Sequence, residues 1–171
     1  MANNVISDAG PIIHLSQIGM SRCFSIFKTV YVPREVYHEV KVCQLPGNRE
    51  IESDMFEIVD LDSNQKDRSE YYSNKYEISV EDGTVIALAE GLEINLVLTD
   101  ELDVRDVLES HKIKPVGSMG VLLRAYRERL ITFRETIKSL DDLLETSTLY
   151  ITSRMIENAK HTLMDYDSAQ G

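Results

Sequence analysis

Short apolar segments alternate with longer amphipathic ones through most of this 171-residue chain. Five segments rich in β-branched or apolar residues, bounded by polar or turn-forming ones, predict β-strands at residues 4–7, 30–32, 56–59, 96–99 and 114–116. Helical patterns predict helices at residues 12–18, 22–27, 34–42, 84–89, 102–110 and 119–128, and the polar stretch 64–76 is also predicted to be helical. Because strands and helices alternate, we expect an α/β fold whose mostly parallel sheet is covered on both faces.

The strand pattern stops after Ile131. Residues 133–145 and 152–164 predict two amphipathic helices, and the tail from Asp165 is expected to fray. We therefore expect an α/β domain over residues 1–131 and a C-terminal helical pair over residues 132–171, packed on that domain or on a partner protein. Within the α/β domain, Ser79 and Ser118 are expected to cap helices.

Four carboxylates stand where they should meet at one edge of the predicted sheet. Asp8 and Asp100 each follow a strand, and Asp82 stands at the start of the helix that leads to the fourth strand. Glu39 lies in the second turn of a helix, with its side chain directed back toward the helix start. If the first and fourth strands are neighbours, their ends form a crevice where carboxylates supply the oxygen ligands that Mg²⁺ or Mn²⁺ prefers.

Each carboxylate also has a structural interpretation. Asp82 and Asp100 are suited to cap helices, and Glu39 suits a solvated helix face where it can pair with a lysine. Asp8 is harder to explain in this way, because a carboxylate that directly follows a buried strand is costly to hold near a core without a partner. Metal-dependent chemistry is therefore the leading hypothesis, and the structural interpretations stay open.

The net charge of −11 argues against a general nucleic-acid binder, because attraction to phosphates normally needs a basic face. The main basic cluster comprises Arg124, Arg127, Arg129, Arg134 and Lys138. It fits a solvated helix face, a track for a phosphate backbone or the docking surface of an acidic partner, and the sequence leaves these three open.

The sequence argues against a membrane-spanning or secreted protein. No apolar run approaches the roughly 20 residues that span a bilayer, and the N-terminal residues lack the positive and apolar regions of a secretory signal. Cys23 and Cys43 are too few for a disulfide framework, do not have the spacing of a zinc site, and are predicted to be small buried side chains. We expect a cytoplasmic protein with no membrane contact.

Other chemistries have weaker support. The four histidines show no pattern of a nucleophile and its base, so we expect them to be exposed or structural. A dehalogenase-type nucleophile at Asp8 would need a second aspartate two residues later, where Gly10 stands. A phospho-receiver domain would need paired acids before the end of the first strand and a late lysine.

Five segments, in order and at plausible spacing, resemble PIN-domain proteins. Residues 5–15 and 32–40 are similar to the opening of those proteins, and residues 82–89 to their central acid followed by a helix. Residues 98–105 are similar to their late acidic strand end, and residues 116–123 to the segment that follows it. The helical pair over 133–165 also resembles the ending of one uncharacterised PIN-like group.

The resemblance implies a three-layer α/β/α fold, an acidic Mg²⁺ or Mn²⁺ site and cleavage of RNA phosphodiester bonds. Many members of the family are toxin ribonucleases held in check by an antitoxin, and a homodimer is expected from the resemblance alone. Carried over residue by residue, the metal and catalytic site comprises Asp8, Glu39, Asp82 and Asp100, with Glu101 or Asp103 as further ligands.

The chain departs from the family pattern at several positions. Either Glu81 or Asp82 can be the middle acid, and Asp100, Glu101 and Asp103 compete for the last ligand position. Gly10 stands where a hydroxyl residue is frequent. Arg105 is expected to neutralise neighbouring acids, with contact to a substrate phosphate as the alternative. These departures keep open a second hypothesis, a catalytically weak PIN-like protein that works as a protein-interaction module.

Overall fold

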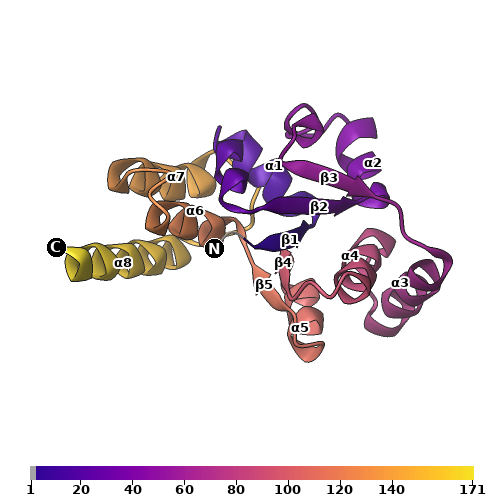
Figure 1. Ribbon diagram of the computed structural model, residues 1–171. Coiled ribbons are helices and arrows are strands. Elements are labelled where there is room, and N and C mark those ends of the chain that lie inside the picture. Colours follow the sequence, from indigo (N-terminus) through magenta and orange to yellow (C-terminus); the bar gives the residue numbers. More distant parts are fainter. Residues whose placement is uncertain (1–2) are drawn as a thin grey trace.

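The computed structural model describes residues 3–171 and has a five-stranded sheet at its centre (Figure 1). The strands are β1 (Asn4–Ser7), β2 (Thr29–Pro33), β3 (Phe56–Val59), β4 (Leu96–Leu98) and β5 (Lys114–Val116). They lie in the order β3-β2-β1-β4-β5, and every pair is parallel. The five predicted strands and the parallel sheet are confirmed, and β1 is the neighbour of β4, as the site prediction requires.

Helices cover both faces of the sheet. They are α1 (Ala9–Gln17), α2 (Arg34–Val42), α3 (Ser63–Tyr76), α4 (Val80–Gly91), α5 (Leu102–Ser110), α6 (Ser118–Arg127), α7 (Phe133–Glu145) and α8 (Ser153–Gln170), with short 3₁₀ segments η1 (Ser21–Ile26) and η2 (Glu50–Glu52). Figure 1 shows α1 and α2 on one side of the sheet and α3, α4 and α5 on the other. The three-layer α/β/α fold is confirmed.

The central strands are buried on both faces, as in other parallel sheets. Val5 and Ile6 of β1, and Val97 and Leu98 of β4, have no exposed surface. The middle of α4, residues 83–89, is also buried throughout. The polar residues that follow β1 and β4 therefore stand at the ends of fully buried strands.

Helices α1 and α4 begin earlier than the apolar spacing alone predicts, at the polar side chains that cap them, and the expected cap by Ser79 is confirmed. The carboxylate of Asp8 accepts the backbone N–H of Ala9, so α1 begins at Ala9. The hydroxyl of Ser79 accepts the backbone N–H of Asp82, so α4 begins at Val80. The expected cap of α6 is wrong: Gly117 is its N-cap, and Ser118 lies inside the helix.

One carboxylate ties α3, α4 and α5 together. Glu90 of α4 accepts a hydrogen bond of 2.6 Å from the Tyr72 hydroxyl and pairs with Arg68, both on α3. Its other oxygen lies 2.8 Å from Nδ1 of His111, the residue that ends α5. Because α4 carries Asp82 and α5 carries Asp103, this network helps to fix the elements that supply two of the predicted site residues.

The C-terminal helical pair packs on α6. Leu140 and Leu143 of α7 and Ile156 of α8 are buried in the same core as the sheet. The expected fraying from Asp165 is wrong, because α8 continues to Gln170 and Tyr126 of α6 donates a hydrogen bond to Asp167. That the pair forms a separate domain beyond residue 131 stays a prediction.

Cys23 is buried as expected, but Cys43 is exposed, because it follows the end of α2 at the surface. No helix in the described residues is long and apolar enough to cross a membrane. Residues 1 and 2, which belong to the N-terminal stretch tested for a secretory signal, lie outside the described residues.

Helices α3 and α4 approach each other closely at Gly83, the residue after Asp82. A Cβ atom at this position would lie 2.4 Å from the backbone oxygen of Ser69. We expect Gly83→Ala to lower the free energy of unfolding by about 2 kcal/mol, because the two helices must move apart. Urea unfolding followed by circular dichroism measures the change.

Gly10 of α1 provides a matched control, because it is also helical but has room for a methyl group. A Cβ atom there would lie 3.6 Å from the Cβ atom of Asp100. Gly10→Ala should leave stability within about 1 kcal/mol of the wild type. Equal stability of the two variants would contradict the close approach at Gly83.

Candidate active site

Asp8 occupies the carboxyl end of β1, the central strand, and only 5% of its surface is exposed. Its Oδ1 atom accepts a hydrogen bond of 2.6 Å from the backbone N–H of Ala9. Its Oδ2 atom accepts one of 3.1 Å from the hydroxyl of Thr99, which follows β4. The carboxylate is thus held between two neighbouring strand ends, at the point where the strand order reverses.

Two of the predicted site residues act on this carboxylate. The pKa of Asp8 is raised to about 8, mainly by burial; the negative charges of Asp82 and Glu39 add to the rise, and the hydrogen bonds from Ala9 and Thr99 oppose it. A β-strand end, the first turn of α4 and the middle of α2 therefore place Asp8, Asp82 and Glu39 near enough for their charges to interact, while their role as a metal and catalytic site stays a prediction.

The same electrostatic effects extend to three further acids. The pKa of Glu39 is raised by burial and then by Glu81, Asp82 and Glu101. The pKa of Asp82 is raised by burial and by Glu81 and Asp103, while hydrogen bonds with Ser79 oppose the shift. We call this group the acidic cluster: Asp8, Glu39, Glu81, Asp82, Glu101 and Asp103.

Within residues 3–171, no basic side chain neutralises the acidic cluster. None of the ion pairs in residues 3–171 includes a member of it. Asp82 and Glu81 both come from the first turn of α4, where the helix dipole favours negative charge but does not supply a counter-ion. The mutual repulsion of these carboxylates is what a bound cation would relieve.

The donor set fits a hard divalent cation that keeps part of its water shell. Carboxylate oxygens are the ligands of Mg²⁺ and Mn²⁺, and Mg²⁺ is usually held by one or two protein carboxylates together with several waters. In the described chain, no group of three or more His, Cys, Asp or Glu side chains is close enough to hold one ion. A cation that binds directly to one or two carboxylates and reaches the others through water suits this spacing.

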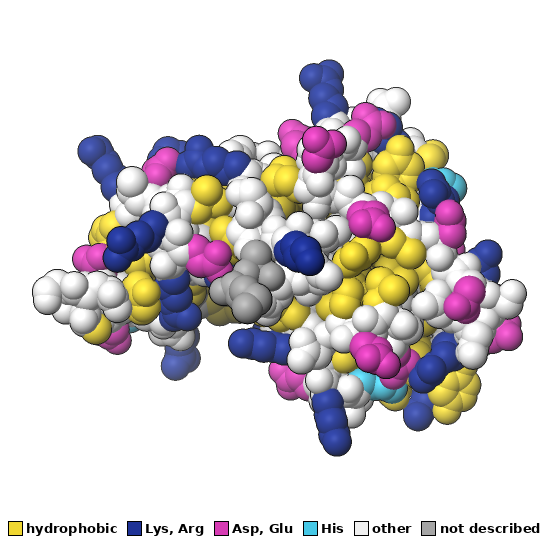
Figure 2. Space-filling view, in the orientation of Figure 1, with side chains coloured by type: hydrophobic (Ala, Val, Ile, Leu, Met, Phe, Trp, Pro, Cys, Tyr) yellow, Lys and Arg dark blue, Asp and Glu magenta, His cyan; other side chains and the backbone are white. Residues whose placement is uncertain are grey.

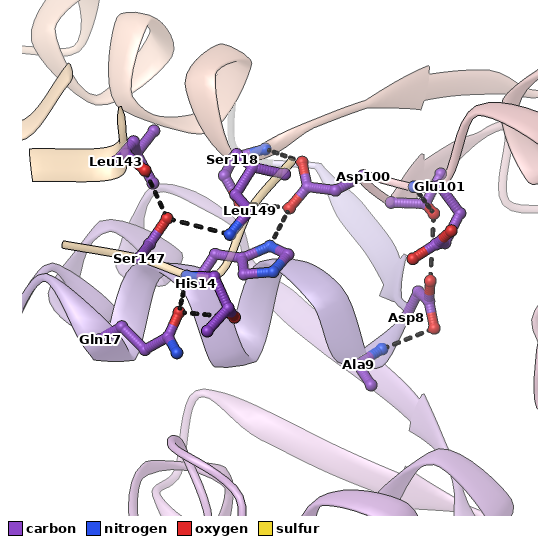
Figure 3. Close-up of polar contacts among 12 residues, drawn as sticks. Asp8, Ala9, His14, Gln17, Asp100, Glu101, Ser118, Leu143, Ser147 and Leu149 are labelled. Atoms are coloured by element: carbon purple, nitrogen blue, oxygen red, sulfur yellow. Dashed lines mark hydrogen bonds and ion pairs between the residues drawn. The ribbon is translucent and has the colours of Figure 1, made fainter. Parts of the chain in front are cut away.

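Asp100 faces away from the acidic cluster. Its Oδ1 atom accepts the backbone N–H of Ser118 at 2.7 Å, and its Oδ2 atom accepts the Ser118 hydroxyl at 2.6 Å and contacts Nδ1 of His14 at 2.7 Å. Figure 3 shows Asp8 and Asp100 in two separate hydrogen-bonded groups. Three of the roughly four lone-pair positions of Asp100 are used in this way, and its role as a metal ligand stays a prediction.

Glycine at position 117 makes the Asp100 contacts possible. A Cβ atom on Gly117 would lie 2.7 Å from Oδ1 of Asp100, so any larger residue would displace the carboxylate or the start of α6. At position 10, by contrast, a residue with a hydroxyl side chain would fit in place of glycine. A Cβ atom on Gly10 would meet Asp100 only at ordinary contact distance.

Three polar residues of this region were not predicted to act in the site. Thr99 donates to Asp8 and accepts the backbone N–H of Glu101 at 3.2 Å, so it joins Asp8 to the start of α5. His14 and Ser118 hold Asp100. In the sequence, the one signal for His14 is its spacing: it lies four residues after Gly10, so the two residues share a face of α1. In the structure this face contacts Asp100.

Arg105 does not form the ion pair that was expected of it. Its guanidinium donates a hydrogen bond of 3.4 Å to the backbone oxygen of Thr99. No carboxylate of the described residues lies within ion-pair distance of it. The contact orients Arg105 beside the site and leaves its charge without a carboxylate partner.

A family model described as a PIN domain, DUF3368, matches residues 4–164, which include β1, the acidic cluster, α7 and most of α8. The chain belongs to the PIN-domain family. PIN domains form a superfamily of nucleases that generally depend on divalent metal ions, so this PIN domain is of a nuclease type, with nucleic acid as its class of substrate. No curated protein matches the chain, and no solved structure matches it.

Burial of Asp8 gives the stability of this PIN domain a defined pH dependence in the presence of a chelator. With a folded pKa of about 8 against an ordinary 3.8, Asp8 holds a proton in the folded chain that the unfolded chain releases between about pH 4 and pH 8. Stability of the wild type should therefore fall as pH rises through this window. Asp8→Asn, which carries no charge, should gain relative stability, up to about 5 kcal/mol at pH 8.

Urea unfolding of both proteins from pH 4 to pH 8.5 measures the difference. Asp67 is an exposed acid of α3, so Asp67→Asn is the matched control and should follow the wild type at every pH. Parallel curves for Asp8→Asn and the wild type would contradict the burial of an unpaired carboxylate.

Proposed function

We propose that this PIN domain is a divalent-metal-dependent endoribonuclease that hydrolyses phosphodiester bonds of single-stranded RNA. The observation that carries the proposal is the buried carboxylate of Asp8, which faces Asp82 and Glu39 at a strand-order switch point with no basic partner in residues 3–171. Such a group of acids has little value for stability. It is well suited to a cation, which in turn attracts a phosphate.

In the proposed site, Asp8, Glu39 and Asp82 hold Mg²⁺ or Mn²⁺, directly or through water. Glu101 is the better candidate for the fourth position than Asp100, since its charge acts on Glu39 while Asp100 is bound to Ser118 and His14. When bound, the ion supplies a water of lowered pKa and charge stabilisation of the phosphate in the transition state. Asp103 is a further acid at the same helix end.

The side chains around the acids hold them in position. The Thr99 hydroxyl fixes the orientation of Asp8 and receives the N–H of Glu101, so a shift of one acid is transmitted to the other. Near neutral pH and without a cation, Asp8 keeps a proton, because its pKa is about 8. Cation binding must displace that proton, which makes affinity for the ion rise with pH.

The protein-interaction module is the second candidate. It is favoured by the engagement of Asp100 with Ser118 and His14 and by the spacing of the acids in the described residues, which leaves no three of them on one ion. A toxin role with an antitoxin partner, a homodimer and a cytoplasmic location stay predictions that rest on the family resemblance.

Removal of the Asp8 charge is the direct test of the nuclease. Asp8→Asn keeps the size of the side chain and an acceptor for the N–H of Ala9, so the fold should persist. We expect Mn²⁺-stimulated cleavage of a single-stranded RNA to fall by about a hundredfold or more, because the ion loses its central ligand. Gel analysis of a labelled oligonucleotide measures the rate.

Asp67→Asn again serves as the control and should cut at the wild-type rate. Full activity of Asp8→Asn would remove Asp8 from the mechanism, and with it the proposed site.

Binding of the ion is measurable without any substrate. At one hundred times its dissociation constant, Mn²⁺ stabilises the folded state by about 2.7 kcal/mol. For a chain of this length the melting temperature should then rise by about 5–10 °C. Differential scanning fluorimetry should show this rise for the wild type and a much smaller one for Asp8→Asn. No rise at millimolar Mn²⁺ would favour the interaction module.

A further inference from the structure

A groove of about 1080 Å³ begins at the acidic cluster and follows the edge strand β5. At one end it is lined by Asp100, Glu101 and Asp103, and it then passes between β5 and one face of α6. The connector between α7 and α8, residues 148–151, also lines it. In the space-filling view, several separate Lys and Arg side chains project along the lower edge of this face of the molecule (Figure 2).

Four basic side chains line the groove: Arg105, Lys114, Arg124 and Arg127. Arg124 pairs with Glu128, but no carboxylate of residues 3–171 lies within ion-pair distance of the other three. In a chain of net charge −11, basic side chains without a carboxylate partner in the described residues give a positive local charge to the part of the groove that lies away from Glu101 and Asp103, although Arg127 also lies over the ring of Tyr166.

The connector presents an aromatic ring at the edge of the groove. Tyr150 is 92% exposed, while Leu149 and Ile151 on either side of it pack against the core. The connector is fixed in place, because Gln17 of α1 accepts hydrogen bonds from the N–H and the hydroxyl of Thr148. Figure 3 shows this anchor on the same helix as His14. The ring of Tyr150 therefore points outward from an anchored connector and is not packed against the rest of the described chain.

We infer that this groove is a binding track for a single strand of nucleic acid, with Lys114 and Arg127 bound to phosphates and Tyr150 stacked on a base. Unpaired cations and an exposed aromatic ring are the two elements with which proteins hold single strands. A duplex offers no free base face for the ring. Because the groove opens onto Glu101 and Asp103, the strand leads to the acidic cluster, and Arg105 lies where phosphate and acids meet. That the strand is RNA rests on the proposed function.

Equilibrium binding in chelator tests the track without cleavage. The probe is a fluorescein-labelled dodecauridine, measured by anisotropy in EDTA over a range of salt concentrations. The double variant Lys114→Gln/Arg127→Gln should bind at least tenfold more weakly, and the salt slope should fall by about 1.4, as expected for two lost contacts to a single strand. Tyr150→Ala should bind about tenfold more weakly without a change of the salt slope.

Matched controls lie outside the groove. Lys66→Gln/Lys112→Gln removes two exposed basic side chains that have no ion-pair partner in the described residues, and Tyr71→Ala removes an exposed tyrosine of α3. Both should bind within twofold of the wild type. Equal losses in groove and control variants would overturn the track, because binding would then follow only the total charge. So would full affinity of the groove variants.

Two further probes identify the occupant. A dodecathymidine that loses affinity in the same variants supports the track for single strands in general. A poly-glutamate peptide that displaces the RNA, with no effect of Tyr150→Ala on the binding of either, would overturn it in favour of an acidic protein partner.

The two proposals can fail independently of each other. Loss of cleavage in Asp8→Asn with full binding by the groove variants would refute only the track. Lost binding in the groove variants with full cleavage by Asp8→Asn would refute only the nuclease site.

Discussion

The structure depends on one constraint: a carboxyl group buried at the end of the central strand, with carboxylates facing it and no basic side chain of residues 3–171 paired with it. Burial of Asp8 costs free energy that its two hydrogen bonds, from Ala9 and Thr99, offset only in part. An asparagine would meet the same two partners without the charge. A side chain that lowers stability where an uncharged one would serve points to a role outside folding, and a cation gives the charge such a role.

Those parts of the fold and of the site that follow from the direction of the chain could be predicted from the sequence. Parallel strands end at a common edge and the next helices begin there, so Asp8, Asp82 and Glu39 had to approach one another once β1 and β4 were neighbours. This inference needs no side-chain detail, because it depends only on where each residue stands in its strand or helix. For the same reason the strand positions and the covering helices were predictable from apolar periodicity.

Side-chain direction was not predictable. Asp100 follows β4 as Asp8 follows β1, yet it turns toward α6, because Ser118 offers it an N–H and a hydroxyl where Gly117 leaves room. That outcome depends on residues far from Asp100 in sequence, one of which is a glycine with no chemistry of its own. The end of α8 was missed for a similar reason, since its support is a contact with Tyr126 on another helix.

Helix α1 joins the α/β domain to the C-terminal helical pair, which the sequence left free to pack on that domain or on a partner. Its N-cap is Asp8, its middle carries His14 against Asp100, and one turn later Gln17 binds Thr148 of the connector. A helix of nine residues is short and stiff, so these three attachments have a fixed spacing. The α7–α8 pair is therefore fixed in position relative to the acidic cluster. A ligand that spans the acidic cluster and Tyr150 binds a surface whose two ends are both positioned by α1. Because this surface is already ordered before binding, the protein loses less conformational entropy when the ligand binds.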